Sequence, residues 1–356
     1  MAHRTIVAAV DVEDPKRPIE PELIELEALA ETAGATIVER IVQRRSAVDP
    51  AYLFGSGKAS EIAQRVKDLD AELVLILNDV RPRQRKNLEK VISVPIVDRT
   101  MLILDVFARH ARSREGKLQV ELAQLRYRQS NLIGAGADLS RLGGGIGTRG
   151  PGETKLEVDR RRIQERISVL RRQLKDVARG RENRRTAGGE PLVALVGYTN
   201  VGKSSLLNVL ARSDAFVADQ PFATLDPTVR RVYLAPDRYV RMADTVGFIT
   251  ELPKDLVNAF RATLEELRGA DLLIHVLDAS NPDWPRQRAA VEGILHELEL
   301  DGTPRLLVFN KVDQPSVTPS LSKGELNDGA ILVSAKTGEG LAALRAAIAE
   351  RTAVVK

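Results

Sequence analysis

Residues 197–204, GYTNVGKS, combine two glycines, a lysine and a serine at the spacing G-x-x-x-x-G-K-S. An apolar run precedes them and a helical pattern follows. In that context the glycines let backbone N–H groups wrap phosphate, Lys203 can reach the β and γ oxygens, and the Ser204 hydroxyl can bind Mg²⁺. The N-terminus of the helix adds its dipole. The stretch predicts a phosphate-binding loop, or P-loop.

A second motif addresses the base of the nucleotide. The apolar stretch 306–313, LLVFNKVD, ends in N-K-x-D, where the carboxylate of Asp313 can accept from N1–H and the 2-amino group of guanine. Adenine has neither donor there, so it would leave the carboxylate unpaired. A plain Asn/Asp turn would be the simpler interpretation if the P-loop were absent. Together the two motifs predict GTP.

Three further pieces follow in the expected order. MADTVG, 242–247, supplies Asp244 to Mg²⁺ through water and a Gly247 N–H to the γ-phosphate. In the Pro-bounded loop PFATLDPT, 221–228, Thr224 can ligate Mg²⁺ and sense the γ-phosphate as a switch, with Thr228 as a competing candidate. LVSAK, 332–336, can line the guanine edge.

Two residues leave the mechanism open. Many GTPases place a water-orienting glutamine after D-T-V-G, but this chain has Phe248, whose ring cannot hydrogen-bond water. Hydrolysis then relies on Mg²⁺, Lys203, backbone donors and a partner's groups, which predicts slow intrinsic turnover that a partner accelerates. Phe248 is equally expected as a core residue. Asn200 either helps hold K⁺ beside the phosphates or only shapes the loop.

The elements that position these residues form two predicted domains. Apolar stretches 5–12, 35–42, 72–78 and 94–98 alternate with helical patterns, which predicts a parallel sheet with crossover helices. From residue 100 the pattern becomes helical to about 131. A second helix is expected over about 153–178, so the two form an antiparallel hairpin. Residues 179–191, polar and charged, are predicted to be a linker.

The sequence therefore predicts an α/β fold. An N-terminal domain, 1–187, comprises an α/β part, 1–100, and a basic helical hairpin, 101–187, with a glycine-rich loop. A P-loop GTPase (Ras-like) domain follows over 188–356.

Composition excludes several classes of protein. The chain has no cysteine and only four histidines, so disulfides and thiolate metal sites are excluded and a structural zinc site is not expected. It has no apolar run of membrane-spanning length, and acids interrupt its first residues where a signal peptide would be apolar. We therefore expect a soluble, cytoplasmic monomer without a membrane span.

Charge is segregated along the chain. The whole chain carries a formal +4, whereas residues 106–185 contain 20 Lys/Arg against 9 Asp/Glu, a local +11. Within this segment the glycine-rich loop LGGGIGTRGPGETKLE, 142–157, has no preceding strand and no G-K-[ST] ending, so a second nucleotide site is not expected. RNA phosphates are the predicted ligands, and a solvated basic face with a structural loop is the alternative. The candidate RNA contacts are Arg141, Arg149, Lys155, Arg160, Arg161 and Arg162.

The motif FGSGKASEI, near residue 54, and the stretch GGGIGTRGPGETKLEVDRRRI, from residue 143, resemble the HflX family of GTPases, and the resemblance covers nearly the whole chain. It implies a factor that binds the large ribosomal subunit and its rRNA and splits ribosomes, notably under stress. It also implies that Mg²⁺ lies on Ser204 and Thr224. A ribosome contact made by the C-terminal extension of some members is not expected here.

The predicted site can be listed by role. The predicted catalytic residues are Lys203, Thr224 and Gly247. The predicted nucleotide-binding residues are Gly197, Tyr198, Thr199, Asn200, Val201, Gly202, Lys203, Ser204, Phe222, Ala223, Thr224, Leu225, Asp226, Asp244, Thr245, Val246, Gly247, Asn310, Lys311, Val312, Asp313, Ser334, Ala335 and Lys336.

Two rival functions stay open beside a ribosome-splitting GTPase. One is an RNA-binding protein whose affinity the nucleotide regulates. The other is an ATP-dependent RNA remodeller that uses the N-terminal domain. GSGKASE, 55–61, lacks the spacing of a P-loop and is predicted instead to start a helix, with Ser56 or Ser60 near the cap.

Overall fold

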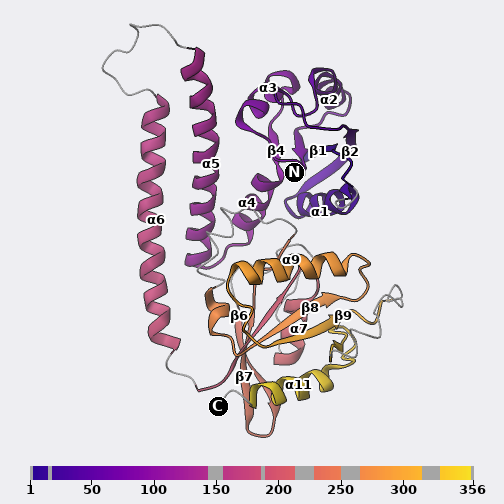
Figure 1. Cartoon of the computed structure of the whole chain (residues 1–356), viewed down its shortest axis with the longest axis vertical. Coiled ribbons are helices and arrows are strands. Elements are labelled where there is room, and N and C mark those ends of the chain that lie inside the picture. The colour runs from indigo at the N-terminus through magenta and orange to yellow at the C-terminus, as the bar shows by residue number, and fades with distance from the viewer. Residues whose placement is uncertain are drawn as a thin grey trace. The chain divides into compact units, whose positions relative to one another are not determined.

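The computed structural model describes residues 3–14, 18–142, 155–185, 189–212, 228–249, 265–314 and 329–353. The chain divides into two compact units, one of Met1–Arg109 with Lys117–Lys175 and the other of His110–Gly116 with Asp176–Lys356 (Figure 1). The first unit carries a four-stranded sheet and the second a six-stranded sheet. Among the helices that the structure describes, none is long and apolar enough to span a bilayer.

The sheet of the first unit alternates with helices along the chain. Its strands lie in the order β2-β1-β3-β4, and each neighbouring pair is parallel. A parallel pair needs a crossover, and a helix supplies each one. The elements are β1 His3–Asp11, α1 Ile19–Thr32, β2 Ala35–Arg44, α2 Ser56–Asp68, β3 Leu73–Ile76, α3 Pro82–Ile92, β4 Ile96–Asp98 and α4 Arg99–His110.

Helices cover both faces of this sheet. Ile6, Ala8 and Val10 of β1 share one apolar core with buried residues of α2 and α3. Figure 1 shows α1 on the opposite side of the sheet from α2 and α3. Because β1 is buried on both faces, it reads as a continuous apolar run rather than an alternating one.

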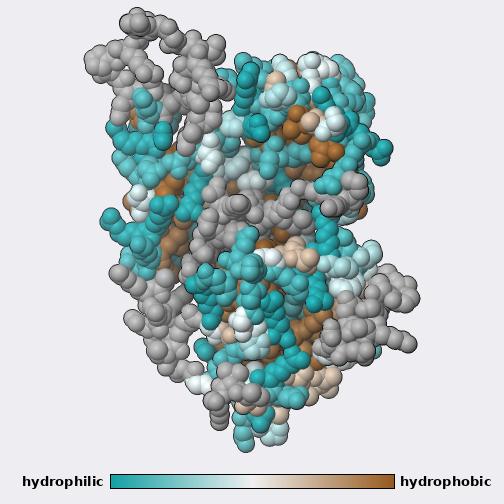
Figure 2. All heavy atoms as spheres, viewed as in Figure 1, coloured by the Kyte–Doolittle hydropathy of each residue, from teal (hydrophilic) through white to brown (hydrophobic). Residues whose placement is uncertain are grey.

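The predicted helical hairpin is present in the same unit. Helix α5 spans Arg114–Leu142 and α6 spans Lys155–Arg185. Leu118 and Leu122 of α5 pack against Ile167 and Leu170 of α6, and Figure 2 shows brown apolar atoms between the two largely teal helices. Glu121 of α5 accepts from the Arg166 guanidinium at 2.7 and 3.0 Å. The helices run antiparallel (Figure 1).

Two predicted boundaries are wrong. The helical pattern expected to end at about residue 131 continues in α5 to Leu142. Residues 179–185, expected to belong to a linker, continue α6 to Arg185. Arginine and glutamate are good helix formers, and the single Gly180 costs only about 1 kcal/mol relative to alanine, so the charged composition does not end the helix. The division into compact units falls within α6, after Lys175. The predicted boundary between the N-terminal domain, 1–187, and the GTPase domain, 188–356, stays a prediction. Most of the glycine-rich loop, 143–154, lies outside the described residues.

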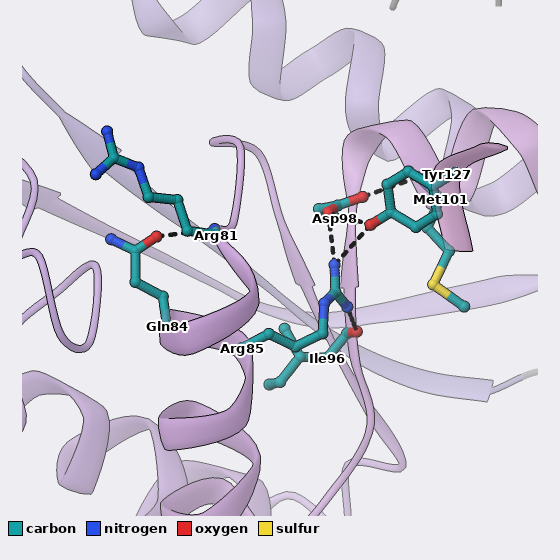
Figure 3. Close-up of polar contacts among 7 residues, drawn as sticks. All are labelled: Arg81, Gln84, Arg85, Ile96, Asp98, Met101 and Tyr127. Carbon is teal, nitrogen blue, oxygen red and sulfur yellow. Dashed lines mark hydrogen bonds and ion pairs between the residues drawn. The ribbon is translucent and has the colours of Figure 1, made fainter. Parts of the chain in front are cut away.

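A polar cluster joins the hairpin to the sheet of the first unit. Tyr127 of α5 donates its hydroxyl to Asp98 Oδ2 at 2.5 Å, and the Arg85 guanidinium of α3 donates to the same oxygen at 2.5 Å and to the Tyr127 hydroxyl at 2.8 Å (Figure 3). Arg85 also donates to the Ile96 carbonyl, and Asp98 Oδ1 accepts from the Met101 N–H at 2.9 Å. The consecutive elements α3 and β4 therefore meet the more distant helix α5 at one carboxylate.

Burial and charge stabilise this cluster in one protonation state. Asp98 is only 3% exposed. Burial, and then the adjacent Asp98 carboxylate, raise the pKa of the Tyr127 phenol, so that the hydroxyl stays protonated and remains a donor. The Arg85 cation compensates the charge of the buried Asp98 carboxylate.

The second unit is built around one mixed sheet. Its strands lie in the order β10-β9-β8-β5-β7-β6, and only β6 runs antiparallel to its neighbour. Figure 1 shows α9 and α11 on opposite sides of this sheet. The described elements are β5 Leu192–Gly197, α7 Lys203–Ala211, β6 Thr228–Ala235, β7 Arg238–Asp244, a 3₁₀ helix η1 Glu265–Gly269, β8 Leu272–Asp278, α9 Trp284–Glu297, β9 Arg305–Asn310, β10 Ile331–Leu332 and α11 Leu341–Ala353.

The Tyr127→Phe variant tests the polar cluster. It removes the hydrogen bond donated to the Asp98 carboxylate and the one accepted from Arg85, so we expect the free energy of unfolding of the first unit to fall by about 1–3 kcal/mol. Amide hydrogen exchange in β4 and α5 measures it. The single tryptophan, Trp284, lies in the second unit, so its fluorescence transition in urea should not move.

Tyr52→Phe is the matched control. Tyr52 packs half-buried against the core of α2 and α3, and its hydroxyl makes no hydrogen bond within the described residues. Equal losses of protection in the two variants would show that the Tyr127 hydroxyl contributes nothing specific.

Candidate nucleotide-binding site

The carboxyl ends of four neighbouring parallel strands meet at one edge of the second sheet. Gly197 ends β5, Asp244 ends β7, Asp278 ends β8 and Asn310 ends β9. Ligands of open α/β sheets bind at this edge, since the loops that follow the strands converge there. The residues that the sequence singled out on separate motifs are therefore brought together.

The backbone of the loop 197–204 explains its residue types. Helix α7 begins at Lys203, with Gly202 as N-cap at φ 91°, and Asn200 has φ 59°. Glycine and asparagine tolerate this left-handed region better than other residues. A Cβ at Gly197 would lie 2.3 Å from the carbonyl oxygen of Val276, so only glycine fits beside β8. The first-turn N–H groups of α7 make this end suited to an anion.

Lys203 is buried inside the loop. Its Nζ donates to the carbonyl oxygens of Gly197, at 3.1 Å, and Tyr198, at 2.8 Å. Burial lowers the pKa of the Lys203 amine to about 8, and the nearby Asp244 carboxylate partly offsets the shift. An anionic phosphate beside this amine would stabilise its charged form, because an opposite charge favours ionisation.

Two oxygen-bearing side chains meet beside Lys203. Ser204 Oγ donates to Asp244 Oδ2 at 2.5 Å, and Asp244 is 2% exposed. A hydroxyl and a carboxylate are hard oxygen ligands of the kind that Mg²⁺ prefers, so these residues fit a magnesium ion. Residues 213–227, which include Phe222, Ala223, Thr224, Leu225 and Asp226, lie outside the described residues. The competing Thr228 is the first residue of β6, opposite Asp244 in the antiparallel ladder.

The segment after Asp244 is attached to the P-loop by its backbone. Phe248 N–H donates to the Gly197 carbonyl at 3.1 Å, and Thr199 N–H donates to the Phe248 carbonyl at 2.7 Å. The Phe248 side chain is 1% exposed, so it is a core residue, as one of its two interpretations held. Thr245 Oγ1 donates to the Leu195 carbonyl at 2.7 Å. These bonds place Gly247 against the P-loop.

At the other end of the site, the carboxylate of Asp313 is held in its ionised form. Ser334 Oγ donates to Asp313 Oδ1 at 2.7 Å, and this hydrogen bond is the main cause that lowers the pKa of the Asp313 carboxyl below its usual value. Ser334 Oγ in turn accepts from the N–H groups of Lys336, at 3.2 Å, and Thr337, at 3.0 Å. The loop after β10 therefore supports the acid that would recognise the base.

Asn310 is engaged with the protein itself. Its Nδ2 donates to the Val201 carbonyl at 2.9 Å, and its Oδ1 accepts from the Ala335 N–H at 3.0 Å. The side chain is 2% exposed. A Cβ at Gly202 would lie 2.3 Å from Asn310 Nδ2, so the P-loop glycine also makes room for this amide. One side chain thus joins three of the predicted motifs.

Asp278 has a role at the site that was not predicted from the sequence. Its Oδ2 pairs with Lys311 Nζ at 2.8 Å, and its Oδ1 accepts from the N–H and hydroxyl of Ser280, at 2.9 and 2.6 Å. Lys311 has φ 66°, a conformation that costs energy in a residue with a side chain. The ion pair helps to hold that turn. An acidic residue ending the apolar strand LLIHVLD was the available signal.

The predicted RNA contacts are partly described. Arg160, Arg161 and Arg162 are exposed on α6. Arg141 lies in α5 and Lys155 begins α6, while Arg149 lies outside the described residues. At GSGKASE, α2 begins at Ser56 as predicted, but neither serine caps it. The cap is Gly55 at φ 93°, and Ser60 Oγ donates to the Ser56 carbonyl at 3.1 Å, one turn inside the helix.

Family models match three consecutive parts of the chain. The model described as "GTP-binding GTPase N-terminal" matches residues 20–108, and "GTP-binding GTPase Middle Region" matches 110–187. The model described as "50S ribosome-binding GTPase" matches 192–311. The last contains the P-loop, β6, β7 and the end of β9, and so most of the site described above.

Individual proteins are similar over nearly the whole chain. "GTPase HflX" from Caldanaerobacter subterraneus subsp. tengcongensis is 50% identical over 332 residues, 92% of this chain and 76% of that protein. "GTPase HflX" from Escherichia coli (strain K12) is 45% identical over 335 residues, 93% and 79% of the two chains. A GTP-binding protein from Sulfolobus solfataricus, solved with GDP, aligns over 99% of this chain and 100% of its own, with a TM-score of 0.51 and 24% identity. This last likeness concerns the fold.

The Gly247→Ala variant tests the contact between Gly247 and the P-loop. A Cβ there would lie 2.8 Å from Thr199 Cγ2, 2.9 Å from Thr199 Cα and 3.2 Å from Lys203 Nζ, so the loop must shift. We expect GTP hydrolysis, measured as phosphate release, to fall on the order of 10- to 100-fold.

Gly293→Ala is the matched control, because a Cβ at this position in α9 meets nothing within 4 Å. It should leave hydrolysis unchanged and stabilise the second unit by about 0.5–1 kcal/mol. Hydrolysis by Gly247→Ala at the rate of the unsubstituted protein would contradict the placement of Gly247.

Proposed function

Because this chain belongs to the HflX family of GTPases and hydrolyses GTP, we propose that it binds the large ribosomal subunit in its GTP state and dissociates ribosomes, notably under stress. The observation that carries the proposal is the pairing of a nucleotide site with an exposed basic helix in one chain. GTP favours the bound state and hydrolysis releases it, since a ligand shifts an equilibrium by its differential affinity.

In the proposed mechanism each part of the nucleotide has its own residues. Lys203 and the N-terminus of α7 bind the β- and γ-phosphates, while Gly247 donates its N–H to the γ-phosphate. Ser204 and Thr224 would hold Mg²⁺, with Asp244 beside Ser204. The ion would neutralise the charge that develops on the phosphate oxygens. Thr224 would thereby make the predicted switch segment, 221–228, sensitive to whether the γ-phosphate is bound.

Asp313 selects the base. Its carboxylate, kept ionised by Ser334, accepts from N1–H and the 2-amino group of guanine. Adenine would leave this charged acceptor without donors, which disfavours it strongly. The base end of the site is lined by Lys311, Val312, Ala335 and Lys336. Asn310 fixes the position of this end relative to the P-loop through its hydrogen bonds to Val201 and Ala335.

Slow intrinsic hydrolysis follows from the position of Phe248. Its side chain is buried in the core, so position 248 offers no group to orient the attacking water. Lys203 and backbone donors supply electrostatic stabilisation but no positioned acceptor for the water. We infer that contact with the ribosome completes the site and accelerates turnover.

The basic face of α6 supports an RNA partner. Arg160, Arg161 and Arg162 are exposed on a helix whose other face packs against α5, so the hairpin presents positive charge on a rigid element. Arginines on such a surface neutralise RNA phosphates and release counterions. The polar cluster of Arg85, Asp98 and Tyr127 anchors α5 to the sheet of the first unit, so the exposed arginines are carried by a fixed element.

Large subunits should stimulate hydrolysis about tenfold or more, and the stimulation should weaken as salt rises. Phosphate release is measured with purified protein, alone and with isolated large subunits, at several salt concentrations. The double variant Arg160→Glu with Arg162→Glu should need about tenfold more subunits for half-maximal stimulation, with its basal rate unchanged.

Lys67→Glu with Lys90→Glu is the matched control, since it changes the net charge equally at exposed positions of α2 and α3. Stimulation that is absent in the unsubstituted protein would point instead to an RNA binder regulated by nucleotide. Equal losses in both double variants would mean that only net charge matters.

The role of Asn200 separates two mechanisms. If its side chain helps to hold K⁺ beside the phosphates, turnover should be higher in KCl than in NaCl. Asn200→Gly should abolish that difference, because glycine keeps the φ of 59° but lacks the amide oxygen. If Asn200 only shapes the loop, rates in the two salts are equal and Asn200→Gly turns over normally.

A further inference from the structure

One face of the β6–β7 hairpin is exposed. Val229, Arg231 and Tyr233 alternate along β6 with residues that pack inward, such as the buried Val232. Across the ladder Arg231 lies opposite Arg241, and Tyr233 lies opposite Tyr239. The inward face contacts α7 and α11, whereas α9 contacts β5 and β8. β6 is the last strand in the sheet order, so this face ends at a sheet edge.

Aromatic and arginine side chains are arranged on this face. The rings of Tyr233 and Tyr239 are 5.4 Å apart at 64°. The Arg231 guanidinium lies 3.8 Å above the Tyr239 ring, and Arg231 also pairs with Glu190 at 2.6 Å. These contacts limit the rotamers of Arg231 and both rings, so little conformational entropy would be lost on binding.

The groups of this face differ in exposure, and Tyr239 and Arg241 are half-buried. Tyr233 is 45% and Val229 is 51% exposed, in a unit whose other strands are mostly buried. Of the four arginines in residues 228–241, Arg231 and Arg241 lie on this face, where Glu190 is the one acid paired with them among the described residues, while Arg238 donates to the Ala349 carbonyl of α11. The surface is therefore both aromatic and cationic.

We propose that the exposed face of the β6–β7 hairpin, built by Val229, Arg231, Tyr233, Tyr239 and Arg241, is a second RNA-contacting surface that stacks unpaired bases of ribosomal RNA. Tyrosine rings stack on bases of any sequence, and arginines neutralise the adjacent phosphates. The inference rests on the proposed function and adds a surface to it that is separate from the helical hairpin.

The position of the hairpin gives this surface a further property. β6 begins at Thr228, where the predicted switch segment 221–228 ends, and β7 ends at Asp244, which bonds Ser204 of the P-loop. RNA bound to the hairpin would therefore contact the two strands that flank the γ-phosphate motifs. Thermodynamic linkage then applies. If RNA binding at this surface favours one nucleotide state of the protein, that nucleotide must in turn raise the affinity of the surface for RNA.

A protein partner is the competing occupant, because an edge strand can also accept an added strand. Charge favours RNA, because this face carries Arg231 and Arg241 against the single acid Glu190 within the part of the chain that the structure describes. A peptide pairing along β6 would not need the two tyrosines on the sheet face. The identity of the contacted molecule decides between the two.

Photo-crosslinking identifies that molecule. A photoreactive p-azidophenylalanine replaces Tyr233 in the full chain, which is bound to large subunits with a non-hydrolysable GTP analogue. The same substitution at Ala343, exposed on α11, is the control. We expect the product from position 233 to be sensitive to ribonuclease. A product sensitive only to protease, or no product from bound protein, would overturn the inference.

A binding measurement accompanies the crosslink. Tyr233→Ala should bind large subunits about tenfold more weakly and keep its basal GTP hydrolysis. Val209→Ala, which truncates an exposed residue of α7, should bind normally. Unchanged affinity of Tyr233→Ala would overturn the inference alone. Failure of the unsubstituted protein to bind subunits would overturn the proposed function and this inference with it.

Discussion

The buried side-chain amide of Asn310 connects the phosphate end of the nucleotide site to its base end. It donates to Val201 in the P-loop and accepts from Ala335 in the loop after β10. Both partners are backbone groups, so the amide fixes the spacing of two loops that otherwise belong to strands on different parts of the sheet. Loss of either bond would leave a buried polar group unsatisfied, which costs about 1–3 kcal/mol.

Other constraints of the site act through this spacing. Gly202 must lack a Cβ because the amide occupies that volume. Lys311 adopts a left-handed backbone next to Asn310, and Asp278 compensates through its ion pair. Ser334 holds Asp313 in its charged form on the adjoining loop. The base-recognising acid is thus positioned by hydrogen bonds that begin in the P-loop.

Much of the fold could be predicted because its signals are local. Apolar stretches marked β1 to β4, and glycine and lysine spacing marked the P-loop, since each depends on neighbouring residues. The linker over 179–185 was mispredicted because charged composition is shared by loops and by solvated helices. The meeting of Arg85, Asp98 and Tyr127 depends on how three elements pack, and the bonds of Asn310 depend on tertiary geometry, so neither left a local pattern in the sequence.

The backbone bonds of Phe248 extend strand pairing past the ends of β5 and β7. Thr199 and Phe248 each donate to a carbonyl of the opposite segment, so neither amide can exchange with solvent until the two segments separate. The P-loop and the 244–248 segment should consequently open as one cooperative unit rather than as two independent loops. A ligand that stabilises one of the two segments therefore also slows amide exchange in the other. Exchange of the Thr199 and Phe248 amides is consequently a common measure of whether a ligand occupies the nucleotide site.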